Sequence, residues 1–131
     1  EAVLVHAVAR IALHGAIDNI QTSWVKMGVA GVQACLRAGA NDLGGTLMNE
    51  SITRAAGTEH GQEWSPVQMH ENVAAIGRRA TQRTTLYGPV SEERRAAGED
   101  AAPLSEPVNT PAKKYERRKT PVELVRNELL G

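Results

Sequence analysis

Apolar residues recur at helical spacing in three stretches of the chain. The first covers residues 2–14 and the second residues 29–36, and each ends shortly before a glycine. Apolar stripes of this period that end near glycine are typical of amphipathic helices. The third stretch starts at Ser65, which forms a capping-box pattern with the proline and glutamine that follow it, and runs to Gly77. The pattern therefore predicts three helices.

Two shorter segments have the composition of β-strands. Residues 20–25 are β-branched and aromatic, whereas residues 41–47 alternate between polar and apolar. Gly44 and Gly45 in the second segment suggest the close approach of a ligand or another backbone. Helices and strands thus alternate, as in the βα units of a parallel sheet. Two strands cannot close such a sheet, so we predict an incomplete α/β fold.

Beyond the second strand the pattern changes twice. Residues 48–65 form a long polar loop in which Glu50–Ala56 is predicted to make a short helical turn. Proline, glutamate, alanine and arginine then dominate residues 89–120 without periodicity, and so little apolar surface cannot offset the entropy of ordering. We therefore expect a folded unit at residues 1–88, a disordered linker at 89–120 and a short terminal helix at 121–131.

The composition limits what this chain can be by itself. Its 131 residues include 3% aromatics and no phenylalanine, so the core has to be aliphatic and a self-sufficient domain is marginal. Lysine plus arginine (15) balance aspartate plus glutamate (15), which leaves no overall field to attract nucleic acid or an anionic membrane. The basic stretch 113–119 is interpreted as a solvated tail. No nucleic-acid or membrane partner is expected.

Thiols and imidazoles are too few and too scattered for a metal centre. Cys35 is the one cysteine, so the chain can form neither an internal disulfide nor a multi-thiolate site, and we expect it to be a small buried hydrophobe. The four histidines lack the HExxH spacing of zinc enzymes. We expect no metal bound by this chain and a location in the reducing cytoplasm.

Polar side chains gather where both predicted strands end. They are Ser23 and Lys26 after the first strand, and Thr46, Asn49 and Glu50 after the second. In parallel α/β barrels ligands bind at the carboxyl ends of the strands, so these residues are candidates for a binding edge. Asp42 lies on the same face of its strand as Thr46. The alternative is that Asp42 and Thr46 only cap neighbouring elements.

Four blocks of the sequence carry a family resemblance. They are residues 19–26, 38–50, 56–61 and 82–87. In this order they resemble the C-terminal end of the FO synthase family, over about residues 1–88. More narrowly, they are similar to its radical SAM half, the 5-amino-6-(D-ribitylamino)uracil:L-tyrosine 4-hydroxyphenyl transferase. The resemblance implies the C-terminal portion of a TIM-like (β/α) radical SAM barrel.

The resemblance also implies a reaction. In the family, a 4Fe-4S cluster reductively cleaves S-adenosylmethionine to a radical, which fragments L-tyrosine so that its 4-hydroxybenzyl group joins 5-amino-6-(D-ribitylamino)uracil in the biosynthesis of the deazaflavin coenzyme. The cluster motif CxxxCxxC is absent from this chain and is expected upstream. By itself the chain is therefore expected to bind neither cofactor, to be inactive, and to need the missing N-terminal portion of the barrel.

Eight residues match the family's blocks and are the candidate residues for binding substrate or S-adenosylmethionine. They are Gln21, Ser23, Lys26, Asp42, Thr46, Asn49, Glu50 and His60. The hydroxyls suit hydrogen bonds to a ribose, ribityl or amino-acid group, Glu50 suits an ammonium, and Lys26 suits a carboxylate. His60 is suited to shuttle a proton, because imidazole titrates near neutrality. No catalytic residue is assigned.

Two alternatives stay open. One is a menaquinone-pathway radical SAM relative, an aminofutalosine synthase or futalosine cyclase, which shares the glycine, threonine and glutamate pattern of residues 45–57. Those relatives tend to carry an acidic residue where Thr84 stands, so Thr84 and the stretch 59–61 favour FO synthase. The other alternative is a truncated, non-catalytic remnant.

Overall fold

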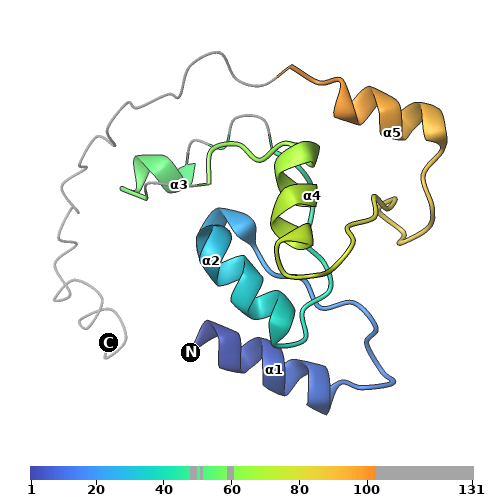
Figure 1. Ribbon diagram of the computed structural model, residues 1–131. Helices are drawn as coiled ribbons and strands as arrows, with labels where there is room; N and C mark the ends of the chain where they lie inside the picture. Colours follow the sequence, from blue (N-terminus) through green and yellow to red (C-terminus); the bar gives the residue numbers. More distant parts are fainter. Residues whose placement is uncertain (48–49, 51, 59–60, 103–131) are drawn as a thin grey trace, which may run out of the picture.

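The described part of the chain is mostly helical. The computed structural model describes residues 1–47, 50, 52–58 and 61–102 (Figure 1). Its helices are α1 (Ala2–Ala12), α2 (Trp24–Arg37), α3 (Ile52–Ala55), α4 (Pro66–Ala74) and α5 (Glu92–Glu99). Both α1 and α4 contact α2, and α4 also contacts α5.

The first two predicted helices are confirmed, with shifted ends. α1 stops at Ala12, and α2 starts at Trp24 rather than at Val29. Gly28 lies inside α2 with φ 62° and ψ −179°, a conformation that glycine tolerates because it has no Cβ. The chain therefore makes one turn, breaks, and continues as a regular helix, which explains why the apolar periodicity begins only after Gly28.

The side chain of Arg10 joins α1 to the end of α2. Its Nε donates to the carbonyl of Gly39 at 2.8 Å, and its two terminal nitrogens donate to Asp18 O at 3.0 Å and to Asn41 Oδ1 at 2.8 Å. The planar guanidinium thus donates to three acceptors, one at Asp18 and two in the stretch 39–41 that follows α2. The position of α1 is thus set by a polar clamp as well as by apolar contact.

The predicted strands are largely wrong for the described residues. The segments 20–25 and 41–47 meet at a single parallel bridge between Gln21 and Asp42. Its hydrogen bonds run from Thr22 N to Asp42 O at 2.9 Å and from Asn41 N to Ile20 O at 3.0 Å. The two segments run parallel, as predicted. In the described residues, however, this bridge is the one sign of the predicted α/β class.

Local geometry explains why the pairing stops so soon. After Ser23 the chain turns into α2, which takes up the rest of the first segment. In the second segment Gly44 adopts the left-handed conformation with φ 75°, which ends the extended backbone. A parallel pair is also weakly stable without further strands beside it, and the described part supplies none.

Helices α3 and α4 agree with their sequence signals. α3 falls inside the predicted turn Glu50–Ala56. At the start of α4, Gln68 N donates to Ser65 Oγ at 3.3 Å and Ser65 N donates to Gln68 Oε1 at 2.9 Å. This is the predicted capping box, with Pro66 in the first turn.

Helix α5 corrects the expectation that residues 89–120 have no structure. Ser91 Oγ accepts a hydrogen bond from Arg94 N at 3.3 Å, and Glu92 and Glu93 follow in the first turn. A cap and acidic residues at the amino end stabilise a helix without any apolar stripe, whereas the prediction rested on the missing periodicity and on the scarcity of apolar surface. Residues 103–131, with the basic stretch and the predicted terminal helix 121–131, lie outside the described residues.

The buried core is small and lies between α2, α4 and Trp64. Its members are Trp24, Val25, Val32, Cys35, Leu36, Ala40, Trp64, Met69 and Val73. The rings of Trp24 and Trp64 lie 5.6 Å apart between centroids, at 41°. Cys35 is buried, as predicted, on the apolar face of α2. The prediction of an aliphatic core is therefore wrong in one respect, because two of the four aromatic residues lie buried in the core and contact each other.

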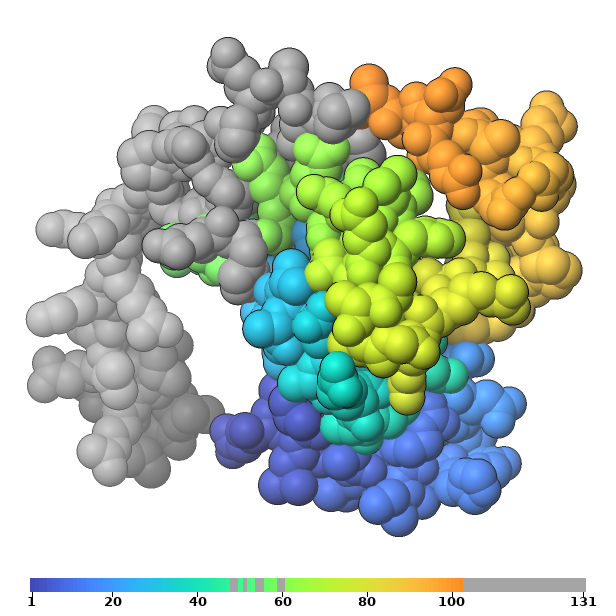
Figure 2. All heavy atoms as spheres, in the orientation of Figure 1, coloured from blue at the N-terminus to red at the C-terminus, as the bar shows by residue number. Residues whose placement is uncertain are grey.

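Helix α1 contributes no buried residue to this core. Along it Leu4 is 66% exposed and Ile11 79% exposed, and further apolar side chains stay accessible. Figure 2 shows α1 as the lower rim of the molecule, with its side chains forming the outer surface. Because this apolar face stays in water, the fold does not gain the free energy that burying it would supply.

Candidate functional site

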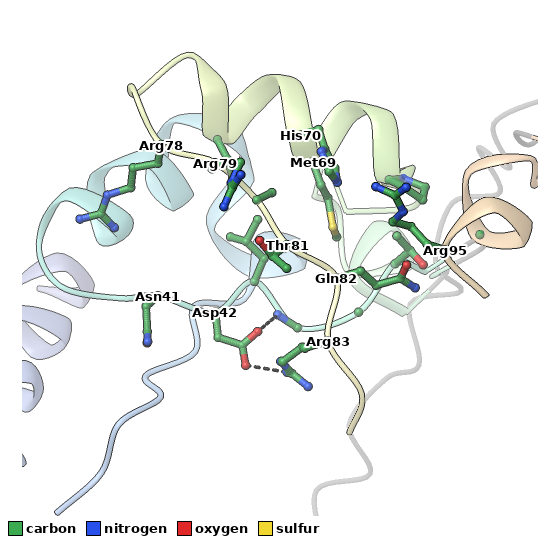
Figure 3. Close-up of a pocket in the computed structure, with 18 of the residues that line it drawn as sticks. Asn41, Asp42, Met69, His70, Arg78, Arg79, Thr81, Gln82, Arg83 and Arg95 are labelled. Carbon is green, nitrogen blue, oxygen red and sulfur yellow. Dashed lines mark hydrogen bonds and ion pairs between the residues drawn. The ribbon is translucent and has the colours of Figure 1, made fainter. Parts of the chain in front are cut away.

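A cavity of about 620 Å³ lies beside the parallel bridge (Figure 3). The segment 41–46, helix α4, the segment 78–83 and helix α5 line it. Two of the predicted site residues, Asp42 and Thr46, are among the lining residues. The cavity therefore begins at the end of the second predicted strand, where the sequence predicted a binding edge.

Asp42 is the most highly connected side chain of this site. It is 8% exposed, and its Oδ1 accepts from Gly44 N at 2.9 Å. Its Oδ2 accepts from Arg83 at 2.6 Å and from the hydroxyl of Tyr87 at 2.8 Å. Burial raises the pKa of the Asp42 carboxyl, but the hydrogen bonds and the charge of Arg83 outweigh it, so the pKa lies below its ordinary value. Asp42 is held as a carboxylate.

Arg83 and Tyr87 complete this arrangement and were not predicted as site residues. The Arg83 guanidinium lies over the Tyr87 ring, 4.1 Å from its centroid. Tyr87 has φ 62°, the one positive φ outside glycine in the described part. The hydrogen bond to Asp42 raises the pKa of the Tyr87 phenol. Both residues belong to the block 82–87, so the family resemblance contained the signal, but nothing in their spacing pairs them with Asp42.

Lys26 and Glu50 meet elsewhere, at the start of α3. Lys26 Nζ donates to Thr53 Oγ1 at 2.8 Å, and Glu50 accepts from the backbone N–H groups of Ile52 and Thr53, both at 3.1 Å. Burial raises the pKa of Glu50, whereas these hydrogen bonds and the charge of Lys26 lower it by more. Neither residue lines the cavity. The structure thus divides the predicted binding edge into two places.

The remaining predicted residues have local positions. Gln21 is exposed, and its amide lies so close to Gly44 that a Cβ there would come within 2.5 Å of Nε2. Ser23 is exposed at the N-cap of α2, where its side chain makes no capping hydrogen bond. Thr46 is exposed in the cavity wall. Asn49 and His60 lie outside the described residues.

One buried hydroxyl near the bridge is unsatisfied. Thr22 is fully buried, and its Oγ1 has no hydrogen-bond partner in the described part. Burying a hydroxyl without a partner costs about 1–3 kcal/mol. Thr22 follows Gln21, the bridge residue of the first predicted strand, and lies on the opposite face of the chain.

The described residues do not fit an iron-sulfur cluster. Cys35 is fully buried among apolar side chains, and no group of three or more His, Cys, Asp or Glu within the described ranges could hold a metal ion. A 4Fe-4S cluster needs several thiolates, which this chain lacks. Separately, none of the helices in the described ranges is long and apolar enough to cross a membrane.

Comparison with known proteins gives relatives of high identity. The chain is 58% identical over 85 residues to FO synthase of Nocardia farcinica (65% of this chain, 10% of that protein). It is 55% identical over 97 residues to FO synthase of Streptomyces coelicolor (74% and 11%). It is 54% identical over 88 residues to the 5-amino-6-(D-ribitylamino)uracil--L-tyrosine 4-hydroxyphenyl transferase of Methanopyrus kandleri (67% and 24%).

These matches confirm the resemblance seen in the four sequence blocks, for one end of a larger protein. The chain spans only 10% to 24% of the length of these relatives. No solved structure matches it. The family model described as the CofH/MqnC C-terminal region matches residues 1–95, which is most of the chain. The chain therefore belongs to the CofH/MqnC C-terminal region family.

Proposed function

We propose that this chain is the C-terminal part of a radical SAM transferase that joins the 4-hydroxybenzyl group of L-tyrosine to 5-amino-6-(D-ribitylamino)uracil in FO biosynthesis. The observation that carries the proposal is the 54% identity, over 88 residues, to a relative that bears the name of this transferase. The relatives named FO synthase, at 55% and 58% identity, support the same pathway. The substrates are small molecules, and the enzyme acts in the cytoplasm.

The proposal includes the barrel. The parallel bridge between Gln21 and Asp42, with α2 between its two segments, is the connection expected of neighbouring strands in a (β/α) barrel. Residues 1–88 then form the C-terminal portion of that barrel. The exposed apolar face of α1 supports this, because the upstream portion would bury it.

The iron-sulfur cluster belongs to the upstream portion. This chain has one buried cysteine, so the 4Fe-4S cluster, which needs several thiolates, is held by residues outside it. Its own residues shape the wall of the reaction chamber. Asp42 fixes the turn at Gly44, Thr46 presents a hydroxyl to the cavity, and Lys26 and Glu50 organise the start of α3. Alone, the chain is inactive.

A chimera tests this function. In FO synthase of Streptomyces coelicolor, the aligned C-terminal segment is replaced by residues 1–95 of this chain, and FO formation is measured after cluster loading. We expect activity within tenfold of the parent, and none from a protein that lacks the segment. A chimera that folds and carries its cluster but makes no product contradicts the proposal.

The family description favours keeping one alternative, because it names MqnC beside CofH. The same segment is therefore placed in an aminofutalosine synthase and in a futalosine cyclase. The transferase proposal predicts that only the FO synthase chimera is active. Activity in a menaquinone-pathway chimera alone would favour that pathway instead, and inactivity in every chimera would favour the non-catalytic remnant.

A further inference from the structure

We propose that Arg83, assisted by Tyr87, is a positioning residue for the turn 42–46. By fixing this turn through Asp42, the two side chains hold the hydroxyl of Thr46 at one place in the cavity wall. The inference deepens the proposed transferase function and rests on it for the role of Thr46. It is carried by the contacts of the Asp42 carboxylate, by the strained backbone of Tyr87 and by the anchors at the other end of the turn.

Both oxygens of the Asp42 carboxylate are engaged, and they connect two distant parts of the chain. Oδ1 accepts from Gly44 N at 2.9 Å, inside the turn 42–46. Oδ2 accepts from Arg83 at 2.6 Å (Figure 3) and from the hydroxyl of Tyr87 at 2.8 Å. A planar carboxylate that is bound at both oxygens cannot rotate without breaking one set of hydrogen bonds. Arg83 therefore fixes, through Asp42, the oxygen that accepts from the turn.

The guanidinium of Arg83 is itself held in one orientation. One terminal nitrogen donates to Thr84 O at 3.0 Å and the other donates to Asp42. Its central carbon lies over the ring of Tyr87, 4.1 Å from the centroid. The backbone of Arg83 is restrained as well, by an antiparallel bridge to Pro89. Because the guanidinium is planar and each side of it has a partner, Arg83 passes the position of its own segment on to Asp42.

The backbone of Tyr87 shows that this arrangement is maintained against strain. Tyr87 has φ 62°, a conformation that is unfavourable for a bulky side chain. It lies in the turn 84–88, in which Thr84 N donates to Gly88 O at 2.9 Å and Gly88 N donates to Thr84 Oγ1 at 3.0 Å. Glycine would occupy the position of Tyr87 without strain, but it has no hydroxyl to donate to Asp42. The hydrogen bond to Asp42 thus offsets the strain of the turn.

The other end of the turn 42–46 is anchored to the core. Trp24 Nε1 donates to Gly45 O at 3.0 Å, and Trp64 N donates to Leu47 O at 3.3 Å. Both tryptophans are members of the buried core. Thr46 therefore lies between a restraint that depends on the core and a restraint that depends on Arg83. Loss of the second restraint should leave the fold in place and free the turn.

Hydrogen exchange in the complete 131-residue chain tests the positioning directly. Arg83→Gln should lower the protection of the Gly44 amide at least tenfold. The amide of Thr22, which donates to the backbone oxygen of Asp42 at 2.9 Å, is the internal reference and should keep its protection within twofold. Unchanged protection of Gly44 overturns the positioning role. Equal losses at Gly44 and Thr22 overturn it too, because they would mean that the substitution destabilises the whole fold.

A milder variant guards against loss of folding. Tyr87→Phe keeps the aromatic ring beside Arg83 and removes only the hydroxyl, so it should lower the protection of Gly44 at least threefold. Arg94→Gln is the matched control, because Arg94 is exposed on α5 and does not line the cavity. Equal protection of Gly44 in Tyr87→Phe and Arg94→Gln overturns the contribution of Tyr87.

A double-mutant cycle in the FO synthase chimera tests the consequence for turnover. Arg83→Gln should lower kcat/KM of the cluster-loaded chimera at least tenfold when Thr46 is present. In a Thr46→Ala background it should lower kcat/KM less than threefold, because the positioned hydroxyl is then missing. Equal factors in the two backgrounds overturn the link to Thr46, since a general loss of stability acts on both alike. An inactive parent chimera contradicts the transferase proposal instead, and hydrogen exchange still decides whether Arg83 positions the turn.

Discussion

The carboxylate of Asp42 accepts a hydrogen bond from the guanidinium of Arg83 at 2.6 Å, although the two residues are 41 positions apart. The contact ties the end of the parallel bridge to the segment that follows α4. Tyr87 reinforces it through its own hydrogen bond to the same oxygen. The side chain of Asp42 is 6% exposed and that of Arg83 is 29% exposed, so solvent screens the pair only in part.

Replacing Asp42 by asparagine should destabilise the chain. Arg83 and Tyr87 would lose their charged acceptor, and loss of one partner of a buried, charge-assisted hydrogen bond costs about 1–3 kcal/mol. Urea denaturation of the complete chain measures the free energy of unfolding. Asp18→Asn is the control, since Asp18 is exposed. An equal loss of unfolding free energy in both variants would show that the hydrogen bonds of Asp42 stabilise the fold no more than an exposed aspartate does.

The same residue should make stability depend on pH. The pKa of Asp42 is lower in the folded chain than in the unfolded one, so its contribution is present above the unfolded pKa, near 4, and is lost as the pH falls through the folded value. Wild type should therefore lose more stability than Asp42→Asn between neutral pH and about pH 3. Parallel pH profiles for the two proteins would contradict this linkage.

The phenol of Tyr87 should titrate above its ordinary range. Its hydrogen bond to the Asp42 carboxylate stabilises the protonated form, and burial and the negative charge add to the effect. Ultraviolet titration in a Tyr115→Phe background isolates Tyr87, because these are the only two tyrosines. Asp42→Asn should move the pKa of Tyr87 back towards about 10. No movement would mean that the hydrogen bond does not form in solution.

Gly61 should tolerate a side chain less well than Gly57. Both have left-handed φ values, 97° and 94°, so alanine strains the backbone by about 1 kcal/mol at either position. At Gly61 a Cβ would also lie 2.7 Å from the carbonyl oxygen of Val25, whereas at Gly57 no atom of the described residues lies within 4 Å of the added Cβ. Thermal denaturation should show a larger loss for Gly61→Ala. Equal losses would argue against the close approach.

The apolar face of α1 should matter only when the rest of the barrel is present. Ile11→Lys should change the unfolding free energy of the isolated chain by less than about 0.5 kcal/mol, because Ile11 is 79% exposed. In the FO synthase chimera the same change should lower stability and FO formation. Val67→Lys, at an exposed position on α4, is the control. A chimera unaffected by Ile11→Lys would show that the upstream portion does not cover α1.

Thr46 should affect turnover if the cavity is part of the reaction chamber. Its hydroxyl is exposed in the cavity wall, where it can bind a ribityl or amino-acid group. We expect Thr46→Ala in the chimera to lower turnover at least tenfold. Thr58→Ala, outside the cavity wall, serves as the comparison. Unchanged kinetics of Thr46→Ala would remove this residue from the site.

Local signals in the sequence determined the helices well. The capping box of Ser65 and Gln68 and the apolar stripe after Gly28 act over a few residues, so their spacing is enough to predict α4 and the regular part of α2. The family membership was likewise contained in short blocks of residues. Helix α5 was not predicted, because its sequence signal is an N-terminal cap without an apolar stripe.

Pairing between distant segments was decided by the tertiary structure alone. The composition of residues 20–25 and 41–47 favoured strands, but strand length depends on neighbours that the described part lacks, so only one bridge formed. Asp42 has two distant partners, Arg83 and Tyr87, which lie 41 and 45 positions away in the sequence. No periodicity of the sequence connects these residues with Asp42. Such contacts are set only when folding has brought the two partners together.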